Sequence, residues 1–293
     1  MYESYYGLDE KPFSLLPDPA FLFMAKKHSM ALSMLEYAVV NECPISVITG
    51  EIGSGKTTLI RYLLNRFDES VSVGLINNTH KSFGNLLQWV SLAYELPYQD
   101  KQEVTLYQQF VDFLIGEYAA SRRTVLIVDE AQNMDADTLE ELRVLSNVNA
   151  DKHNVLQLVL VGQPELRRTL RRPELEQFVQ RVGVAYHLGR LAAEETSQYI
   201  GHRIETAGGD PEIFTPVAKR FIHHRSRGIP RIINSLCDMA LVYGFAEQIP
   251  IIDIELVHEM INDKMKGGFF SHVEAEGDEA DRAGIEQGSL FEE

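Results

Sequence analysis

The sequence has little cysteine and no long uninterrupted run of apolar residues. Cys43 and Cys237 lie far apart among its 293 residues and lack the spacing of metal ligands, so we expect two reduced, semi-buried thiols. No apolar run approaches the roughly 20 residues that a membrane-spanning helix needs. The N-terminus also lacks the basic stretch followed by an apolar one that marks a secretory signal. These absences predict a cytoplasmic protein that would reach a membrane only through a partner.

Basic residues are also in the minority. The chain has 27 Lys and Arg against 43 Asp and Glu, which gives a formal net charge of −16. This charge argues against a protein whose whole surface binds nucleic acid, although it leaves room for a local basic patch. The length allows a large hydrophobic core and two domains.

The sequence does contain a phosphate-binding loop, G-E-I-G-S-G-K-T, at residues 50–57. It fits the pattern G-x-x-x-x-G-K-[ST] and lies between an apolar run at 45–48, expected to be a buried strand, and a stretch of helical spacing. Glycines let the backbone N–H groups turn inward around phosphate oxygens, and the following helix directs its positive end at the same anion. We expect Lys56 to reach the β- and γ-phosphates and Thr57 to bind Mg²⁺. The predicted nucleotide-binding residues of this loop are Gly50, Glu51, Ile52, Gly53, Ser54, Gly55, Lys56, Thr57 and Thr58.

An acidic pair follows the next buried strand. In T-V-L-I-V-D-E-A-Q, residues 124–132, apolar residues run straight into Asp129 and Glu130. Such a run is typical of a parallel sheet, and ligands of open α/β sheets bind at the carboxyl ends of the strands. We expect Asp129 to hold Mg²⁺ and Glu130 to orient and deprotonate the attacking water. The sequence has no N-K-x-D motif for a guanine base, so the pair indicates ATP hydrolysis.

Two further polar residues are candidates for the same site. Gln163 ends the strand predicted at 155–163, where its amide can touch the γ-phosphate or the attacking water. The alternative is a cap for the helix that begins at Pro164. Arg231 falls in the first turn of a helix that begins at Pro230, where a cation opposes the helix dipole unless an anion is nearby. We therefore expect Arg231 to face the phosphates, and a surface arginine is the alternative.

A basic cluster occupies residues 165–181, and three interpretations of it remain open. It can be a solvated helix face, which is the commonest fate of such a cluster. One of its arginines can instead reach a neighbouring subunit's ATP, and Arg181 is the candidate because it ends a helix just before a strand-like segment. The cluster can also contact nucleic acid phosphates. Its members are Arg167, Arg168, Arg171, Arg172 and Arg181.

The two ends of the chain differ from its centre. Residues 1–30 are rich in aromatics and prolines, so they are expected either to wall an adenine pocket or to pack in the core. Helical spacing alone recurs from about residue 190, at 193–206, 214–225, 230–246 and 253–265. Residues 267–293 are rich in glycine and acid and are expected to be a disordered tail.

The motifs stand in the order of an AAA+ ATPase with a helical lid, and in detail the chain resembles the general secretion pathway protein A family. The resemblance covers about residues 1–265. It rests on Y-Y-G-L-D-E-K-P-F-S-L-L-P-D-P-A-F-L-F, T-G-E-I-G-S-G-K-T-T-L, V-D-E-A-Q-N, L-E-E-L-R-V-L-S-N, G-Q-P-E-L and G-I-P-R-I-I-N-S-L-C-D. The segment R-V-G-V-A-Y-H-L-G-R-L looks most like members associated with exosortase and exopolysaccharide export loci.

The resemblance implies an α/β fold with a parallel sheet in a three-layer αβα AAA+ P-loop NTPase core. The expected domains are this core at residues 1–190, a helical lid at 191–266 and the acidic tail at 267–293. Gln163 matches the sensor 1 position, where many AAA+ proteins have Asn or Thr, and Arg181 lies near the usual arginine finger. The other matches are Lys56 and Thr57 with Walker A, Asp129 and Glu130 with Walker B, and Arg231 with sensor 2.

The resemblance also implies a function. We expect a Mg²⁺-dependent ATPase that forms a homo-oligomer, with a hexameric ring as one form, and that powers or switches assembly of an envelope secretion or polysaccharide-export system. Its partners would be proteins of that system, which would place it in the cytoplasm or at the inner membrane. Secretion members continue into a membrane span and a peptidoglycan-binding domain, whereas an acidic stretch stands here, so we do not expect direct cell-wall binding. The alternative is a DNA-associated regulator of the transposition-helper type.

Overall fold

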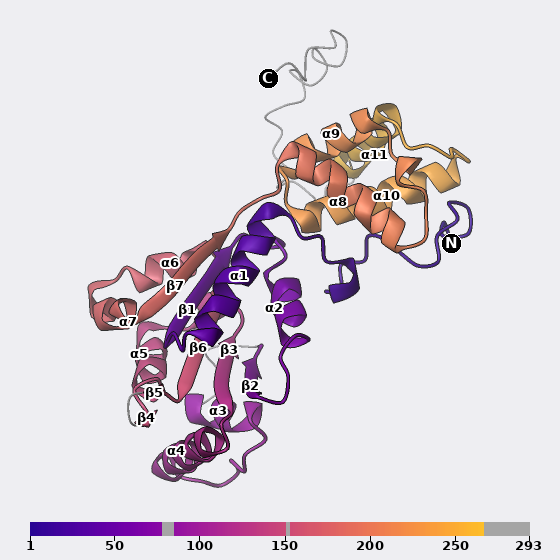
Figure 1. Cartoon of the computed structure of the whole chain (residues 1–293). Helices are drawn as coiled ribbons and strands as arrows, with labels where there is room; N and C mark the ends of the chain where they lie inside the picture. The colour runs from indigo at the N-terminus through magenta and orange to yellow at the C-terminus, as the bar shows by residue number, and fades with distance from the viewer. Residues whose placement is uncertain (78–84, 151–152, 267–293) are drawn as a thin grey trace.

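A five-stranded parallel sheet lies at the centre of the first part of the chain (Figure 1). The computed structural model describes residues 1–77, 85–150 and 153–266. The strand order is β2-β3-β6-β1-β7, so β1 lies between the central strand β6 and the outer strand β7. The strands are β1 Ile45–Gly50, β2 Val71–Ile76, β3 Arg123–Val128, β6 Leu156–Gly162 and β7 Val182–Leu188, and a short antiparallel pair joins β4 Asn149–Ala150 to β5 His153–Asn154.

Helices cover both faces of the sheet, because even its central strands are apolar on both sides. Ile48 and Val159 face one helical layer, whereas Val47 and Leu158 face the other. The first layer holds α1 Lys26–Val40 and α2 Lys56–Leu64. The second holds α3 Leu86–Ala93, α4 Glu103–Ala119, α5 Ala136–Leu145, α6 Pro164–Leu170 and α7 Glu176–Gln180. The predicted three-layer αβα core is therefore confirmed.

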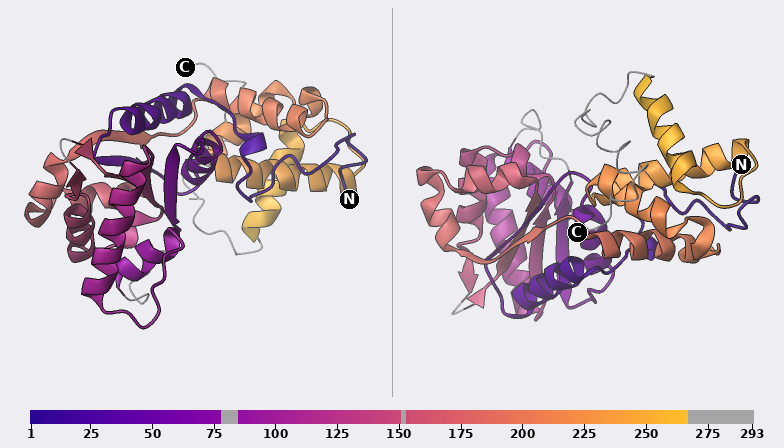
Figure 2. Two further views of the ribbon diagram at one scale, coloured as in Figure 1. Left: turned by 60° about the horizontal axis from the view of Figure 1, so that its bottom comes forward. Right: turned by 90° about the horizontal axis from the view of Figure 1, so that it is seen from above.

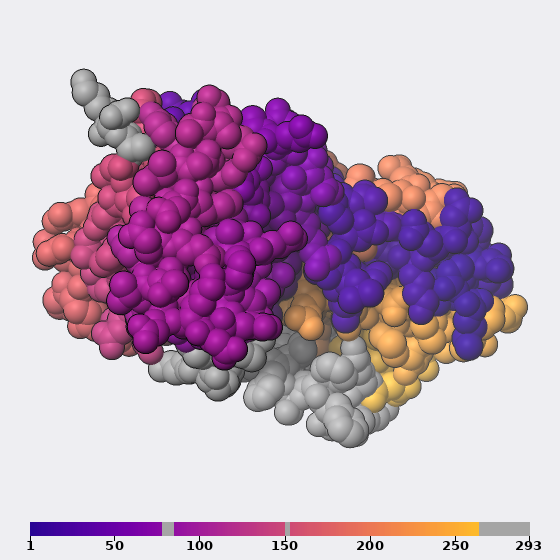
Figure 3. Space-filling view, turned by 90° about the horizontal axis from the view of Figure 1, so that it is seen from below, coloured from indigo at the N-terminus to yellow at the C-terminus, as the bar shows by residue number. Residues whose placement is uncertain are grey.

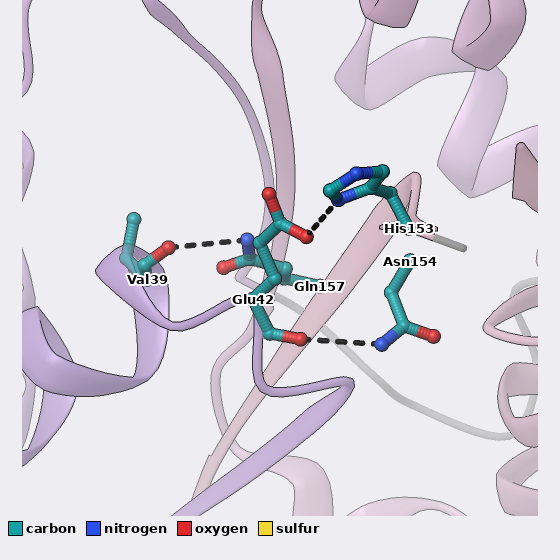
Figure 4. Close-up of polar contacts among 5 residues, drawn as sticks. All are labelled: Val39, Glu42, His153, Asn154 and Gln157. Atoms are coloured by element: carbon teal, nitrogen blue, oxygen red, sulfur yellow. Dashed lines mark hydrogen bonds and ion pairs between the residues drawn. The ribbon is translucent and has the colours of Figure 1, made fainter. Parts of the chain in front are cut away.

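Polar contacts join α1 to the edge of the sheet where the strands begin (Figure 4). Glu42 lies in the turn between α1 and β1, and its carboxylate contacts Nδ1 of His153 at 2.8 Å. The carbonyl of Glu42 accepts a hydrogen bond from Asn154 at 3.3 Å, and that of Val39 accepts one from Gln157 at 3.2 Å. These contacts hold the carboxyl end of α1 where the strands begin. The amino end of α1 lies where the strands end, beside the loop that follows β1.

Four helices form the second part of the chain and have a hydrophobic core of their own (Figure 2). They are α8 Ala193–Thr206, α9 Pro216–Ser226, α10 Pro230–Ala246 and α11 Ile254–Lys266. This arrangement agrees with the predicted helical lid. No helix in the described part of the chain is long and apolar enough to cross a membrane. The tail expected at 267–293 lies outside the described residues.

The N-terminal segment runs along the helical part rather than over the sheet (Figure 3). The side chains of Tyr2, Tyr6 and Phe13 are buried in the same hydrophobic cluster as those of α8–α11. The sequence predicts one core at residues 1–190, but the aromatic start of the chain packs with helices that begin only at Ala193. The remaining short helices are η1 Pro19–Phe21, η2 Ala131–Asn133, η3 Pro173–Leu175 and η4 Pro211–Ile213.

Candidate nucleotide-binding and hydrolysis site

The phosphate loop joins β1 to α2 at the carboxyl edge of the sheet. Gly53 and Gly55 have φ values of 79° and 95°, a conformation that side chains with a Cβ rarely adopt. Gly53 also lies against the lid, since a Cβ built there would come within 2.4 Å of Cβ of Arg231. The loop therefore needs glycine both for its turn and for its contact with α10.

Lys56 lies inside this loop. Its side chain is buried, and Nζ donates to the carbonyls of Gly50 at 2.8 Å and Glu51 at 2.9 Å. Burial lowers the pKa of Lys56, and the carboxylates of Glu130 and Asp129 act in the opposite direction. An ammonium held only by neutral carbonyls is a strong donor for a phosphate oxygen.

The acidic pair lies beside the loop at the end of β3. The hydroxyl of Thr57 donates to Oδ2 of Asp129 at 2.8 Å, and Asp129 is 5% exposed. A hydroxyl and a carboxylate are the hard oxygen ligands that Mg²⁺ prefers, and Mg²⁺ takes most of its other ligands from water and phosphates. Within the described residues, no group of three or more His, Cys, Asp or Glu could hold a metal by itself. The donor set therefore fits a Mg²⁺ ion that arrives with a nucleotide.

Glu130 and Gln163 meet at the same edge of the sheet. Nε2 of Gln163 donates to Oε2 of Glu130 at 3.3 Å, and both residues line one cavity with Lys56 and Thr57. The side chain of Gln163 makes no capping hydrogen bond to α6, a helix that the structure describes completely. The amide therefore lies toward the carboxylate, and its contact with a phosphate or the attacking water stays a prediction.

The lid closes the cavity from the side of α10. The main-chain N–H of Arg231 donates to the carbonyl of Gly53 at 3.1 Å, and the exposed Arg231 lines the cavity. Arg190, which leads from β7 into the lid, makes an ion pair with Glu51 of the loop through two nitrogens at 2.8 and 3.0 Å. The loop is thus in direct contact with both the lid and the segment that carries it.

The cavity has a volume of about 330 Å³ and lies between the phosphate loop, the N-terminal segment and the lid. This size is within the range of small-molecule sites. Phe21 and Phe23 line it, whereas Phe13 is buried in the core of the helical part. Core packing of the aromatic N-terminus is therefore confirmed for Phe13 and Phe21, whereas the adenine pocket stays a prediction for the residues that line the cavity. The cavity is lined by residues 14–18, 21–23, 52, 53, 55–58, 163, 191, 230, 231 and 234, together with His28, Glu130, Tyr199 and Arg203.

Arg181 lies away from this cavity within its own chain. It precedes Val182, which pairs with Ile45 at the start of β1, while the phosphate loop follows the other end of that strand. Nη2 of Arg181 donates to the carbonyl of Ser146 at 3.0 Å. Burial and the nearby Arg143 lower the pKa of Arg181. A role for Arg181 in hydrolysis would therefore concern the site of a neighbouring subunit.

The structure brings three further residues to the site that sequence analysis did not assign. His28 of α1 is buried, with Nε2 3.1 Å from the carbonyl of Ser54, and burial lowers its pKa, which favours a neutral ring that donates to that carbonyl. Gln132 contacts Glu130. Arg203 is 7% exposed and lines the far end of the cavity, with its guanidinium 4.8 Å from the ring of Phe21. Only Gln132 had a sequence signal, its place two residues after Glu130 of the acidic pair.

Comparison with known proteins assigns this site to a class. Residues 40–170 match the model of the AAA domain family. Two solved structures share the fold at low identity. The Aeropyrum pernix ORC2 protein, in its ADPNP-ADP complexes, is 19% identical with a TM-score of 0.65 over 87% of this chain and 71% of its own. The Aeropyrum pernix ORC1 protein in complex with DNA is 15% identical with a TM-score of 0.63 over 87% and 69%. Residues 40–170 therefore match an AAA domain, and the chain has the AAA+ P-loop fold with a helical region after the sheet.

A curated relative narrows the class. General secretion pathway protein A of Aeromonas hydrophila is 40% identical over 247 residues, which is 84% of this chain and 45% of that protein. The chain thus spans about half the length of this relative. Over most of its own length the chain is therefore similar to general secretion pathway protein A, in agreement with the resemblance of its motifs.

Proposed function

We propose that this chain binds Mg²⁺ and ATP between its core and its lid and hydrolyses ATP to ADP and phosphate. One observation carries this proposal. A single cavity is lined by the phosphate loop, Glu130, Gln163 and Arg231, although these parts are up to about 180 residues apart in sequence. Each of them supplies a group that phosphoryl transfer uses.

Hydrolysis in this scheme depends on positioning and electrostatics. The loop amides and Lys56 hold the phosphates, and Glu130 takes a proton from the attacking water. Gln163 contacts the γ-phosphate or that water. Thr57 and Asp129 would hold Mg²⁺, which when bound compensates charge on the phosphate oxygens.

The lid and a neighbouring subunit complete the site in this scheme. Arg231 approaches the phosphates from α10. Turnover would therefore move the lid and change the contacts that the protein makes with its partners. Arg181 is our candidate for the arginine that a neighbouring subunit contributes, in a homo-oligomer that includes the hexameric ring among its forms. ATPase activity would then depend on self-association.

We further propose that turnover powers or switches assembly of a cell-envelope secretion or exopolysaccharide-export system. The 40% identity to general secretion pathway protein A supports this role. The partners would be proteins of that system, and the chain would act in the cytoplasm or at the inner membrane through them. The segment 181–191 favours the members associated with exosortase and exopolysaccharide loci.

A second candidate function is a DNA-associated regulator of the transposition-helper type. The exposed arginines of α6 and the residues after it favour it, because they could contact phosphates of a duplex. These are Arg167, Arg168, Arg171 and Arg172. The net charge of −16 opposes this candidate.

One experiment separates the two candidates. Tagged Glu130→Gln, which should retain ATP, is purified from its native cells with Mg²⁺ and ATP, and everything that accompanies it is identified. Wild-type protein purified without nucleotide is the control. We expect envelope or polysaccharide-export proteins to be enriched with the variant. Enrichment of DNA with a recombinase or transcription factor would overturn the export role in favour of the second candidate.

A further inference from the structure

Gln132 connects the ends of two neighbouring strands of the sheet. It lies in η2, the short turn that follows β3, and its Nε2 donates to Oε2 of Glu130 at 2.5 Å. On the other side, its Oε1 accepts a hydrogen bond from the main-chain N–H of Gln163, directly after β6, at 3.0 Å. One amide therefore links the proposed base to the backbone of the adjacent strand.

The direction of this amide is determined by its partners. The main-chain N–H of Gln163 can only donate, so it requires the oxygen of the Gln132 amide, and the NH₂ group is then left for Glu130. The side-chain NH₂ of Gln163 donates to the same Oε2 of Glu130 at 3.3 Å. Two amides thus hold one oxygen of the carboxylate from two strand ends. Amide donors bring no charge, so they orient the carboxylate without changing the charge balance of the site.

The surrounding backbone is shaped for this contact. A Cβ built on Gly162 would lie 3.0 Å from Oε1 of Gln132, so the amide packs directly against bare backbone at the end of β6. Glu130 itself has a φ of 55°, a left-handed conformation that costs a residue with a side chain about 1 kcal/mol. Such a conformation persists where the neighbours hold it in place, and Gln132 is such a neighbour.

We propose that Gln132 is a positioning residue that orients the carboxylate of Glu130 for activation of the attacking water. The inference rests on the proposed ATPase function and adds a residue to it. A displacement of about 1 Å in a reacting group can cost roughly 100-fold in rate. Loss of the Gln132 amide should therefore lower kcat, while ATP affinity, which depends on the phosphate loop, should change little.

The decisive variant is Gln132→Glu, which keeps the shape and the acceptor for the N–H of Gln163 but removes the donor to Glu130. We expect kcat to fall about 10- to 100-fold at high pH, with the Kd for ATP within about threefold of wild type. The charge of Glu130 raises the pKa of the new carboxyl, so as pH falls this carboxyl gains a proton that it can donate to Glu130, and the loss should shrink. Gln132→Met, which has neither donor nor titratable group, should lose activity equally at every pH.

Asn133→Asp is the matched control, since it adds the same charge at the next, exposed position of the turn. Thermal unfolding of each variant shows whether the fold is intact. A second readout needs no nucleotide: the ¹⁵N–¹H side-chain amide signals of Gln132 should shift when Glu130 is replaced by glutamine.

If Gln132→Glu has the same kcat as Asn133→Asp at every pH while wild type hydrolyses ATP, the inference alone is wrong. If wild type binds ATP but does not hydrolyse it, the proposed function and the inference fail together.

Discussion

Replacement of Glu130 by glutamine is expected to lower kcat for ATP hydrolysis by about 10²- to 10⁴-fold, the usual contribution of a general base. The glutamine amide keeps the size of the side chain but cannot take a proton from water. The contacts that hold the phosphates come from Lys56 and the loop, so ATP should still bind with an affinity within a few-fold of wild type. The variant should therefore accumulate in the ATP-bound state.

Single-turnover hydrolysis and ATP binding, measured on the same preparation, check this expectation. Glu165→Gln is the matched control because it removes an exposed carboxylate from the first turn of α6, at the same edge of the sheet. That control should retain turnover within about threefold, as expected for a screened surface charge. Normal turnover by Glu130→Gln would remove Glu130 from the role of base.

Replacement of Lys56 by methionine is expected to lower the affinity for ATP strongly. The ammonium is buried in the loop and held by the carbonyls of Gly50 and Glu51, so it is available to the phosphates with little surrounding water. Loss of this charge-assisted contact should weaken ATP binding by about 100-fold or more, which corresponds to roughly 2.7 kcal/mol. Methionine keeps the apolar stem of the side chain and favours a helix as lysine does.

Thermal unfolding measures this loss directly. ATP at about 100 times its Kd should stabilise wild type by roughly 2.7 kcal/mol, whereas the same concentration should leave the melting temperature of Lys56→Met almost unchanged. Lys26→Met is the control, because Lys26 is exposed at the start of α1 and its loss removes one charge from outside the loop. Equal stabilisation of both variants by ATP would show that Lys56 does not hold the phosphates.

The phosphate loop and the acidic pair could be predicted because each is a short, continuous stretch of sequence whose residue types indicate its chemistry. A strand, a glycine turn and a helix follow one another at 45–64, and this local order already brings Lys56 and Thr57 to the start of a helix, where an anion is expected to bind. Asp129 comes directly after a strand that is apolar on both faces, so a parallel sheet brings it to the same edge. The contact of 2.8 Å between Thr57 and Asp129 follows from the topology of the sheet.

The remaining parts of the site depend on contacts between residues that are far apart in the sequence, and a local sequence pattern does not reveal such contacts. Gln132 matters because the order of strands puts β6 beside β3, which brings the N–H of Gln163 to its amide. Arg203 lines the cavity because the N-terminal segment packs against α8. There the Nε of Arg203 donates to the carbonyl of Pro12. An aromatic-rich segment predicts burial, but the partner that buries it is set by packing between distant parts of the chain.

ATP hydrolysis should be measured as a rate per chain, with Mg²⁺, over a wide range of protein concentrations. We expect measurable turnover whose rate per chain rises with concentration, because a neighbouring subunit completes the site. A rate per chain that stays constant would contradict the role of the neighbour. Stabilisation by ATP without turnover at any concentration would contradict the claim itself and leave a scaffold that binds nucleotide.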